Sequence, residues 1–202
     1  MNSIEKLAQE FANFPGIGER QAKRFVYFLL RVPKERRNNL AYLINQVSET
    51  VSECQMCFRY FEGKSNTCID CANPAKDKST LMVLEKDADY EGMKKSGAYN
   101  GLYFLLGGSI PIVEKNTNQR VRMNQLLDRI KTDINKNNLS EVILAFSASR
   151  DGDHTADIVR ENIQKIFGTE LKITTLGKGL STGTEIEYSD TDTLSNALKS
   201  RY

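Results

Sequence analysis

The chain of 202 residues has the composition of an ordinary soluble globular protein, with 40% hydrophobic and 27% charged residues. No apolar run is long enough to span a bilayer, and the first residues, Met1-Asn2-Ser3-Ile4-Glu5, lack the basic-then-apolar pattern of a signal peptide. These features exclude a membrane-spanning protein and predict a cytoplasmic one with one or two domains. The formal net charge of +2 is nearly neutral and indicates no class of partner by itself.

The first 53 residues predict three helices. Apolar residues at positions i, i+3, i+4 and i+7 predict an amphipathic helix over 3–13. The segment Phe14-Pro15-Gly16-Ile17-Gly18 ends this helix, and a second helix follows it. Pro33 ends the second helix, and a third helix is predicted from about Lys34 to about Ser52.

The sequence helix, Pro-Gly-Ile-Gly, helix resembles a helix-hairpin-helix DNA-binding motif. Gly16 and Gly18 would let the backbone turn tightly and approach a ligand closely. The helix that follows would offer free N–H groups and its positive dipole end, which suit a phosphate. The alternative interpretation is an ordinary helical hairpin in a bundle, with proline and glycine as breakers.

The charge pattern of the second helix favours the DNA-binding interpretation. Residues 19–37 carry seven basic and two acidic side chains. Arg20 and Arg24 are four residues apart and share one helix face, with Lys23 beside them. These three side chains would grip a DNA backbone without reading the bases. Because basic clusters are also common on solvated helix faces, this one gains its meaning from the glycine turn before it.

All four cysteines lie in one short stretch, as two Cys-x2-Cys pairs separated by ten residues: Cys54, Cys57, Cys68 and Cys71. Each pair can aim two sulfurs at one point, and two pairs supply the four thiolates of a tetrahedral Zn²⁺ site. Such a site has no open position for water, so we expect one structural zinc per chain that contributes folding free energy rather than chemistry.

Two disulfides, a redox pair and unrelated core thiols are the alternatives to zinc. Nothing in the sequence indicates secretion, which argues against disulfides. Neither cysteine pair is predicted to sit after a strand and before a helix, as redox motifs do. Unrelated thiols would not be expected to fall at this double spacing.

After residue 79 the pattern changes to strands that alternate with helices, which predicts a parallel α/β sheet. The predicted strands are 81–84, 102–106, 141–146 and 171–176, and the predicted helices are 90–96, 123–136 and 155–167. In such sheets ligands gather at the carboxyl ends of the strands. The acidic residues there are Glu85 after the first strand, and Asp151 and Asp153 after the third.

This arrangement of acids resembles the Toprim domain, the α/β module of topoisomerases, primases and some nucleases. Catalytic members use a glutamate after the first strand and an Asp-x-Asp after a later one to hold Mg²⁺ for phosphoryl transfer. Here Ser147-Ala148-Ser149 stands where the Asp-x-Asp should be, and hydroxyls are poor Mg²⁺ ligands. The resemblance therefore implies a catalytically degenerate Toprim domain whose acids serve as a contact surface.

Two alternatives to a contact surface remain open. Asp151 and Asp153 could belong to a polar turn in which Asp153 caps a helix from about Thr155. The domain could also be a Mg²⁺-dependent nuclease or a primase-like enzyme.

The last segment, 177–202, predicts a tail that contacts a partner. The stretch 177–183 is rich in glycine but does not match the phosphate-binding Gly-x4-Gly-Lys-[Ser/Thr] loop. Beyond it, we expect a short strand over Glu185–Tyr188 and a last helix over Thr191–Ser200.

The order of these parts resembles the RecR family of bacterial recombination mediators over nearly the whole chain. The resemblance implies a helix-hairpin-helix region over 1–53, a four-cysteine zinc finger over 54–71, a degenerate Toprim domain over 79–176 and an oligomer contact in the tail, 177–202. The implied fold class is α+β overall: an all-α N-terminal region, a small four-cysteine zinc finger and a C-terminal α/β domain with a parallel-rich sheet.

Two further motifs match the family, and two segments depart from it. Tyr99-x-Gly101-Leu102-Tyr103 and Leu106-Gly107-Gly108 match the family's segment after the first strand. The stretch Pro111-Ile112-Val113-Glu114-Lys115-Asn116 stands where family members usually have an acidic loop with Gly-Ile-Gly-Pro. The stretch Arg150-Asp151-Gly152-Asp153 replaces the family's Val-Glu-Gly-Glu and keeps its charges on shorter side chains.

The family resemblance implies a protein that is not an enzyme. RecR-like proteins assemble into ring-like oligomers, here expected to be tetramers, that can encircle DNA. They act with RecO, and in some settings with RecF, to help load RecA onto single strands in gap repair. The implied site residues are Gly16, Gly18, Arg20, Lys23 and Arg24 toward duplex or gapped DNA, Cys54, Cys57, Cys68 and Cys71 toward zinc, and Glu85, Asp151 and Asp153 toward RecO.

Overall fold

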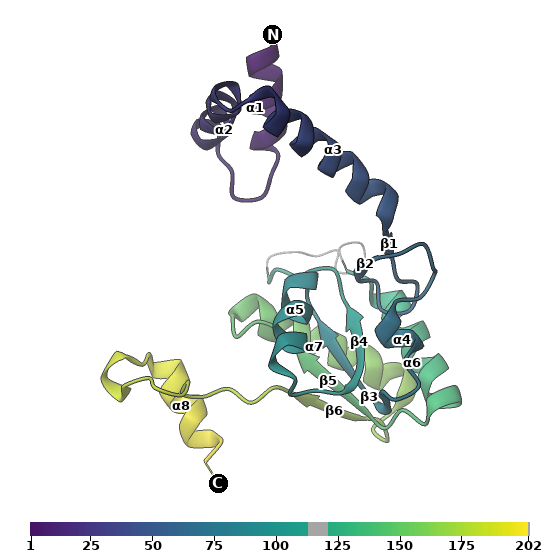
Figure 1. Ribbon diagram of the computed structural model, residues 1–202. Coiled ribbons are helices and arrows are strands. Elements are labelled where there is room, and N and C mark those ends of the chain that lie inside the picture. Colours follow the sequence, from purple (N-terminus) through teal and green to yellow (C-terminus); the bar gives the residue numbers. More distant parts are fainter. Residues whose placement is uncertain (113–120, 202) are drawn as a thin grey trace. The chain divides into compact units, whose positions relative to one another are not determined.

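The computed structural model describes residues 1–112 and 121–201, and the chain divides into two compact units, Met1–Val51 and Ser52–Tyr202 (Figure 1). Of the 111–116 segment that departs from the family pattern, residues 113–116 lie outside the described residues. Over the described part of the chain, no helix has both the length and the apolar character needed to cross a bilayer.

The first unit consists of three helices, as the sequence predicts: α1 (Ser3–Ala12), α2 (Glu19–Arg31) and α3 (Lys34–Thr50). Asn2 caps α1 through a capping box with Glu5, which satisfies free N–H groups at the start of the helix. The side chains of Ala8, Ala22 and Val26 are buried where α1 packs on α2. Small residues at this contact let the two helices approach closely.

The second unit begins with a two-stranded sheet and a short helix that carry the cysteines: β1 (Val51–Glu53), β2 (Tyr60–Glu62) and α4 (Ile69–Ala72). The sequence pattern placed neither cysteine pair before a helix. The structure differs on this point, because Cys68 is the N-cap residue of α4. A helix of four residues is too short for periodicity to reveal.

A four-stranded parallel sheet follows, in the order β4-β3-β5-β6. Its strands are β3 (Asp77–Leu84), β4 (Gly101–Leu105), β5 (Glu141–Ala145) and β6 (Lys172–Thr175). The predicted parallel α/β region is therefore confirmed. Leu84 pairs with Ala145 in the register, so the chain leaves β3 and β5 side by side at the carboxyl edge of the sheet.

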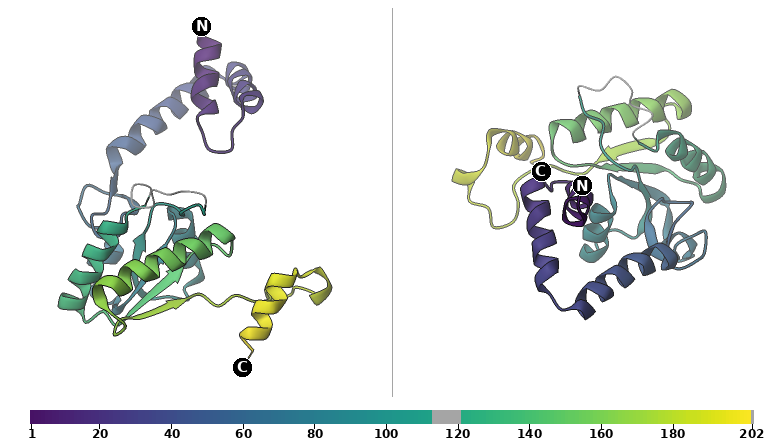
Figure 2. Two further views of the ribbon diagram at one scale, coloured as in Figure 1. Left: turned by 180° about the vertical axis from the view of Figure 1, so that it is seen from behind. Right: turned by 90° about the horizontal axis from the view of Figure 1, so that it is seen from above.

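Helices cover both faces of the sheet (Figure 2), which is why the second half of β3 and the whole of β4 are buried. The helices are α5 (Asp87–Ser96), α6 (Met123–Asn137) and α7 (Arg150–Phe167). Apolar side chains of α6 and α7 pack on one face in the larger core, and Tyr90 and Met93 of α5 pack on the other.

Two elements differ from the prediction: the start of the helix after β5, and the conformation of the chain at Glu185–Tyr188. The helix expected from about Thr155 begins at Arg150, because the Ser149 hydroxyl accepts a hydrogen bond from the Gly152 N–H and caps α7. The strand expected over Glu185–Tyr188 is wrong, since Ile186–Tyr188 is a single 3-10 turn before α8 (Thr191–Lys199).

Candidate nucleic-acid interface and metal centre

The turn between α1 and α2 depends on Gly16. Its φ of +76° lies in the left-handed region that side chains disfavour. The Ile17 N–H donates to the Phe14 carbonyl over 3.0 Å and closes the turn. Gly18 is different, because as the N-cap of α2 it is extended, with φ of −82°. A Cβ at either glycine would meet no neighbour, so both leave open space at the surface of the turn.

The N-terminus of α2 is bare and surrounded by basic side chains. Within the described residues, no side chain caps α2, so the first N–H groups of the helix have no side-chain acceptor. Arg20, Lys23 and Arg24 are all exposed on the first turns of the helix. The only hydrogen bond that the structure records for these three side chains within the described residues runs from Arg24 to the Gln21 side chain, over 3.3 Å. The structure thus brings the predicted basic residues together beside the glycine turn.

Not every basic residue of the 19–37 cluster is available to a ligand. The Arg37 guanidinium donates to the Leu29 carbonyl over 3.1 Å and to the Val32 carbonyl over 2.7 Å. Arg37 therefore satisfies carbonyls at the end of α2 and fixes the turn into α3. This role was missed by sequence reasoning because a charge count does not distinguish a capping arginine from a free one.

The four cysteine sulfurs lie within 4.8 Å of one another, and they are the only such group of histidine, cysteine or acidic side chains among residues 1–112 and 121–201. The Cys57 and Cys68 sulfurs are 3.7 Å apart. Tetrahedral Zn²⁺ with Zn–S distances of about 2.3 Å places its sulfurs about 3.8 Å apart. The cysteines are unpaired as disulfides, and three of the four are buried. The donor set and its spacing fit a closed, structural zinc site.

The backbone around Cys54 and Cys57 forms a tight metal-binding turn. The Phe58 N–H donates to the Cys54 carbonyl over 2.8 Å, and the Cys54 N–H donates to the Arg59 carbonyl over 2.9 Å. Phe58 adopts a φ of +61°, which is uncommon for a bulky residue. The Cys68 N–H lies 3.3 Å from the Cys54 sulfur and donates to it. These bonds preorganise the sulfurs for one shared ligand.

The crowding of four thiols separates their pKa values. Hydrogen bonding with Cys57 lowers the pKa of Cys54 to about 6. Hydrogen bonding with Cys54 lowers the pKa of Cys68 and raises those of Cys57 and Cys71. These directions favour the thiolate at Cys54 and Cys68 and the thiol at Cys57 and Cys71. A divalent metal held by the four cysteines would stabilise all four as thiolates.

The metal-binding turn is built into the second unit rather than standing apart from it. The Leu105 N–H of β4 donates to the Cys57 carbonyl over 2.8 Å. The Arg129 side chain of α6 donates to the Met56 carbonyl and pairs with buried Asp133. The bonds to Cys57 and Met56 join residues 48 and 73 positions apart, and no motif in the sequence predicts them.

The three predicted acids at the carboxyl edge of the sheet do not form one group. Glu85 is only 8% exposed, and its carboxylate accepts a hydrogen bond from the Ser147 N–H over 2.8 Å. Asp151 accepts from the Ile112 N–H over 3.3 Å, and Asp153 pairs with Lys178. The expectation that Glu85 lies on a partner-facing surface is therefore not supported, because burial removes its carboxylate from contact. Asp151 and Asp153 remain exposed.

Ser147 and Ser149, which stand where catalytic Toprim domains carry the Asp-x-Asp, hold the loop after β5 in place. The Ser147 and Ser149 hydroxyls are 2.9 Å apart and share a hydrogen bond. The helix approaches this loop so closely that a Cβ on Gly152 would lie 2.1 Å from the Ser147 carbonyl oxygen. One interpretation of the sequence made Asp153 the cap of this helix. That interpretation is wrong, because Ser149 is the N-cap residue of α7.

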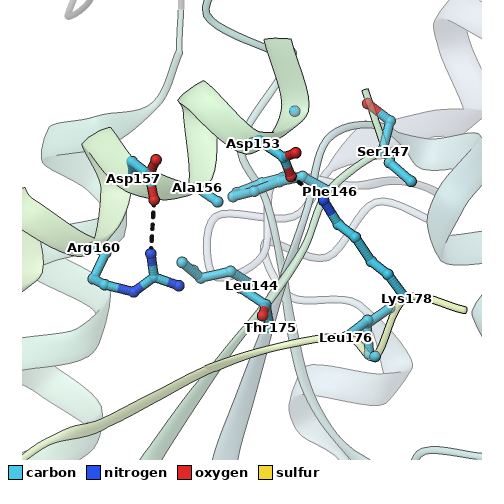
Figure 3. Close-up of a pocket in the computed structure, with 13 residues that line it drawn as sticks. Leu144, Phe146, Ser147, Asp153, Ala156, Asp157, Arg160, Thr175, Leu176 and Lys178 are labelled. Atoms are coloured by element: carbon cyan, nitrogen blue, oxygen red, sulfur yellow. Dashed lines mark hydrogen bonds and ion pairs between the residues drawn. The ribbon is translucent and has the colours of Figure 1, made fainter. Parts of the chain in front are cut away.

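A cleft of about 550 Å³ lies beside this loop, between α7 and the chain that leaves β6. Figure 3 shows Lys178 reaching to Asp153 across one end of it and Arg160 paired with Asp157 on α7. Phe146 and Leu144 supply the apolar floor. Its charged groups are paired with each other, so the cleft presents no unpartnered cluster for a metal or a nucleophile among the described residues.

Comparison with known proteins covers both units. A family model described as "RecR, helix-hairpin-helix" matches residues 4–48, and a Toprim domain model matches residues 79–177. A relative from Dehalococcoides mccartyi, named "Recombination protein RecR", is 33% identical over 98% of this chain and 93% of its own length. Relatives of the same name from Roseiflexus sp. (32% identical, 92% of its length) and Clostridium perfringens (31% identical, 96% of its length) match over 98% of this chain. With its helical hairpin, its four-cysteine centre and its parallel sheet in this order, the chain belongs to the RecR family.

Proposed function

We propose that this protein is a cytoplasmic recombination mediator in DNA repair. In this proposal it is a DNA-binding clamp without sequence preference that acts with RecO, and in some settings with RecF, to load RecA at single-stranded gaps. The names of its relatives support a role in recombination and repair. The observation that carries the DNA-binding part is the bare N-terminus of α2, with Arg20, Lys23 and Arg24 exposed around it.

The proposed DNA contact is made to the backbone of the nucleic acid. A phosphate near Gly16 and Gly18 meets open space above the turn and the free N–H groups that begin α2. Arg20 and Arg24 then add charge-assisted contacts from the same helix face. Such contacts fix position on the duplex or strand but carry no base readout. Binding should therefore be similar across sequences and strongly dependent on salt.

The protein is proposed to make and break no bonds itself. Catalytic Toprim sites need several carboxylates that converge on Mg²⁺, and here Ser147 and Ser149 occupy two of those positions. The remaining glutamate, Glu85, is buried and engaged by a backbone N–H. This arrangement supports a scaffold rather than the rival function, a Mg²⁺-dependent nuclease or primase-like enzyme.

We also propose that the protein assembles into a tetrameric ring, because apolar side chains on α3 and on the tail are exposed in the single chain. None of the residues of α3 is buried, and several of its apolar side chains are exposed: Leu40, Tyr42, Leu43, Ile44 and Val47. Apolar residues on the tail, including Ile186, Tyr188 and Leu198, are exposed as well. Exposed apolar stretches of this length are typical of protein interfaces. We propose that copies of this chain cover them, and that RecO contacts Asp151 and Asp153.

A paired comparison of variants tests the DNA contact. Arg20→Ala/Arg24→Ala should weaken binding to unrelated sequences alike and reduce the slope of log affinity against log salt by about 1.8 for duplex DNA. The control, Arg160→Ala/Lys165→Ala, removes two charges from α7 and should leave the slope unchanged. Fluorescence anisotropy over a range of salt measures both. Equal slopes for the two double variants would contradict the proposal.

Nuclease assays test the rival function. The purified protein with Mg²⁺ should leave gapped and single-stranded DNA intact. Metal-dependent cleavage that disappears in a Glu85→Gln variant would establish the enzyme instead. Size-exclusion chromatography with light scattering, with and without DNA, tests the ring, since a strict monomer under both conditions excludes encirclement.

A further inference from the structure

We propose that Arg59 is the counter-charge of the four-cysteine zinc centre and the residue that anchors this centre to α5. The inference rests on the proposed zinc site and goes beyond it, because Arg59 is neither a ligand nor part of the Cys-x2-Cys pattern. It contacts partly buried Asp70 and buried Tyr90 beside the cysteines, and the exposed Lys94 lies on the outer side of Asp70.

A centre of four thiolates and one Zn²⁺ carries a net charge of about −2. Placing that charge in the protein interior is costly unless a cation or hydrogen-bond donors lie beside it. Cys54, Cys57 and Cys68 are each no more than 1% exposed, so water contributes little to their solvation. The chain must therefore supply the compensation itself.

Arg59 is placed to do so. It is 6% exposed, and it shares with Cys57, Cys71, Asp70 and Tyr90 the wall of one small internal space. This space brings Arg59 beside two of the four cysteines, and an arginine side chain stays charged in a protein.

The other contacts of Arg59 neutralise its positive charge only in part, so it can still compensate the negative charge of the sulfurs. Its Nη2 atom lies 2.9 Å from Asp70, but the same carboxylate oxygen is 3.8 Å from the Lys94 ammonium. One negative charge therefore faces two cations. The Arg59 Nε atom is buried and has no hydrogen-bond partner among the described residues. A buried donor without an acceptor is unusual in a folded protein, and the neighbouring thiolates are the acceptors that the zinc-bound centre would offer.

Nearby arginines are committed elsewhere. Arg129 reaches the metal-binding turn, but its charge is matched by Asp133 at 2.5 Å. Arg122 pairs with Glu53 at 2.6 Å. Among the described arginines that contact the metal-binding turn, Arg59 differs from these two because it shares its carboxylate, Asp70, with Lys94. Its charge is therefore the one that is incompletely neutralised.

Tyr90 connects this charge to α5. The Arg59 guanidinium carbon lies 4.4 Å from the centre of the Tyr90 ring, a cation–π contact. The Tyr90 hydroxyl donates to Asp70, and burial together with this bond raises the pKa of Tyr90, so it stays protonated. Arg59 therefore lies between the cysteine loop and α5, which packs on the sheet. From there it acts as a positioning residue for the zinc ligands.

The test is the rate at which a chelator removes zinc, with circular dichroism as a check on folding. Wild-type protein should hold one zinc per chain. Arg59→Met keeps the length of the side chain and removes the charge, and it should release zinc about 10-fold faster or more. The control Arg160→Met removes an arginine from an exposed pair with Asp157 and should release zinc at the wild-type rate.

Each outcome has a distinct meaning. Arg59→Met with wild-type release from a zinc-loaded protein overturns the role of Arg59 and leaves the zinc site intact. Wild-type protein without zinc overturns the zinc site itself and this inference with it. If Arg59→Met does not accumulate in folded form, Arg59→Lys decides. The proposal expects it to keep zinc with release only a few-fold faster, and complete loss of zinc from folded Arg59→Lys contradicts it.

Discussion

The buried ion pair between Arg129 and Asp133 on α6 gives the sharpest test of how the metal-binding turn is held. The two side chains are 5% and 0% exposed, and the Arg129 Nε atom lies 2.5 Å from the carboxylate. The same arginine donates to the Met56 carbonyl, and Asn137 donates to the other oxygen of Asp133. Arg129→Met leaves a buried carboxylate without its cation, which should lower the free energy of unfolding by about 3–5 kcal/mol.

The double variant Arg129→Met/Asp133→Leu separates charge from packing. It removes the stranded carboxylate and leaves mainly the Met56 carbonyl unsatisfied, so the loss should fall to about 1–3 kcal/mol. The control Arg160→Met breaks an exposed pair and should cost less than about 1 kcal/mol.

Urea unfolding followed by the near-ultraviolet signal of the buried tyrosines reports on the second unit, since Tyr90 and Tyr103 lie in its core. A single variant that costs no more than the surface control would refute the reasoning. So would a double variant that loses more stability than the single one, because the stranded charge would then not be the source of the loss.

Three further predictions follow from other parts of the second unit. Gly152→Ala would place a Cβ 2.1 Å from a backbone carbonyl oxygen and should lower the unfolding free energy by about 1–3 kcal/mol. Gly92→Ala, at an open helical position, should raise it by about 0.5–1 kcal/mol, and equal effects in urea titrations would contradict the clash. Cys68→Ser should lose zinc, shown by metal analysis, and lower the melting temperature of the second unit alone; normal melting would contradict a structural metal. A hydrogen bond from Thr174 lowers the pKa of Glu141, so the stability it contributes is present above the ordinary pKa and is lost as pH falls through the lowered one. An NMR titration should show that pKa rising in Thr174→Val, and an unchanged value would exclude the bond as its cause.

Much of the fold follows from local pattern, because hydrophobic period and breakers act over a few residues. The apolar runs that became β3 and β5 and the glycine turn before α2 are of this kind. Glu185–Tyr188 was misread because apolar and acidic residues alternate there as in a strand, while the chain in fact turns just before Asp190 caps α8. An alternating stretch of four residues cannot distinguish the two conformations.

The candidate sites were predictable only where spacing itself carries chemistry. The cysteines and the basic residues of α2 belong to this class. Arg59, Arg122 and Arg129 do not, because each becomes meaningful only when folding brings it to a sulfur, a carbonyl or a carboxylate far away in the chain. Glu85 was misplaced for the same reason, since a residue after a strand can point to solvent or, as here, under the Ser147 backbone.

The contact between the cysteine loop and β4 has a consequence for the metal-free protein. β4 is an outer strand of the sheet, and its Leu105 backbone is occupied on the outer side by the Cys57 carbonyl and the Arg122 guanidinium. The loop that carries Cys57 thereby covers the edge of β4 at Leu105, where the strand would otherwise offer a free backbone N–H to a neighbouring molecule. If the proposed zinc is removed, we expect the cysteine loop to loosen and to expose this edge of β4, along which strands of neighbouring chains can pair and aggregate.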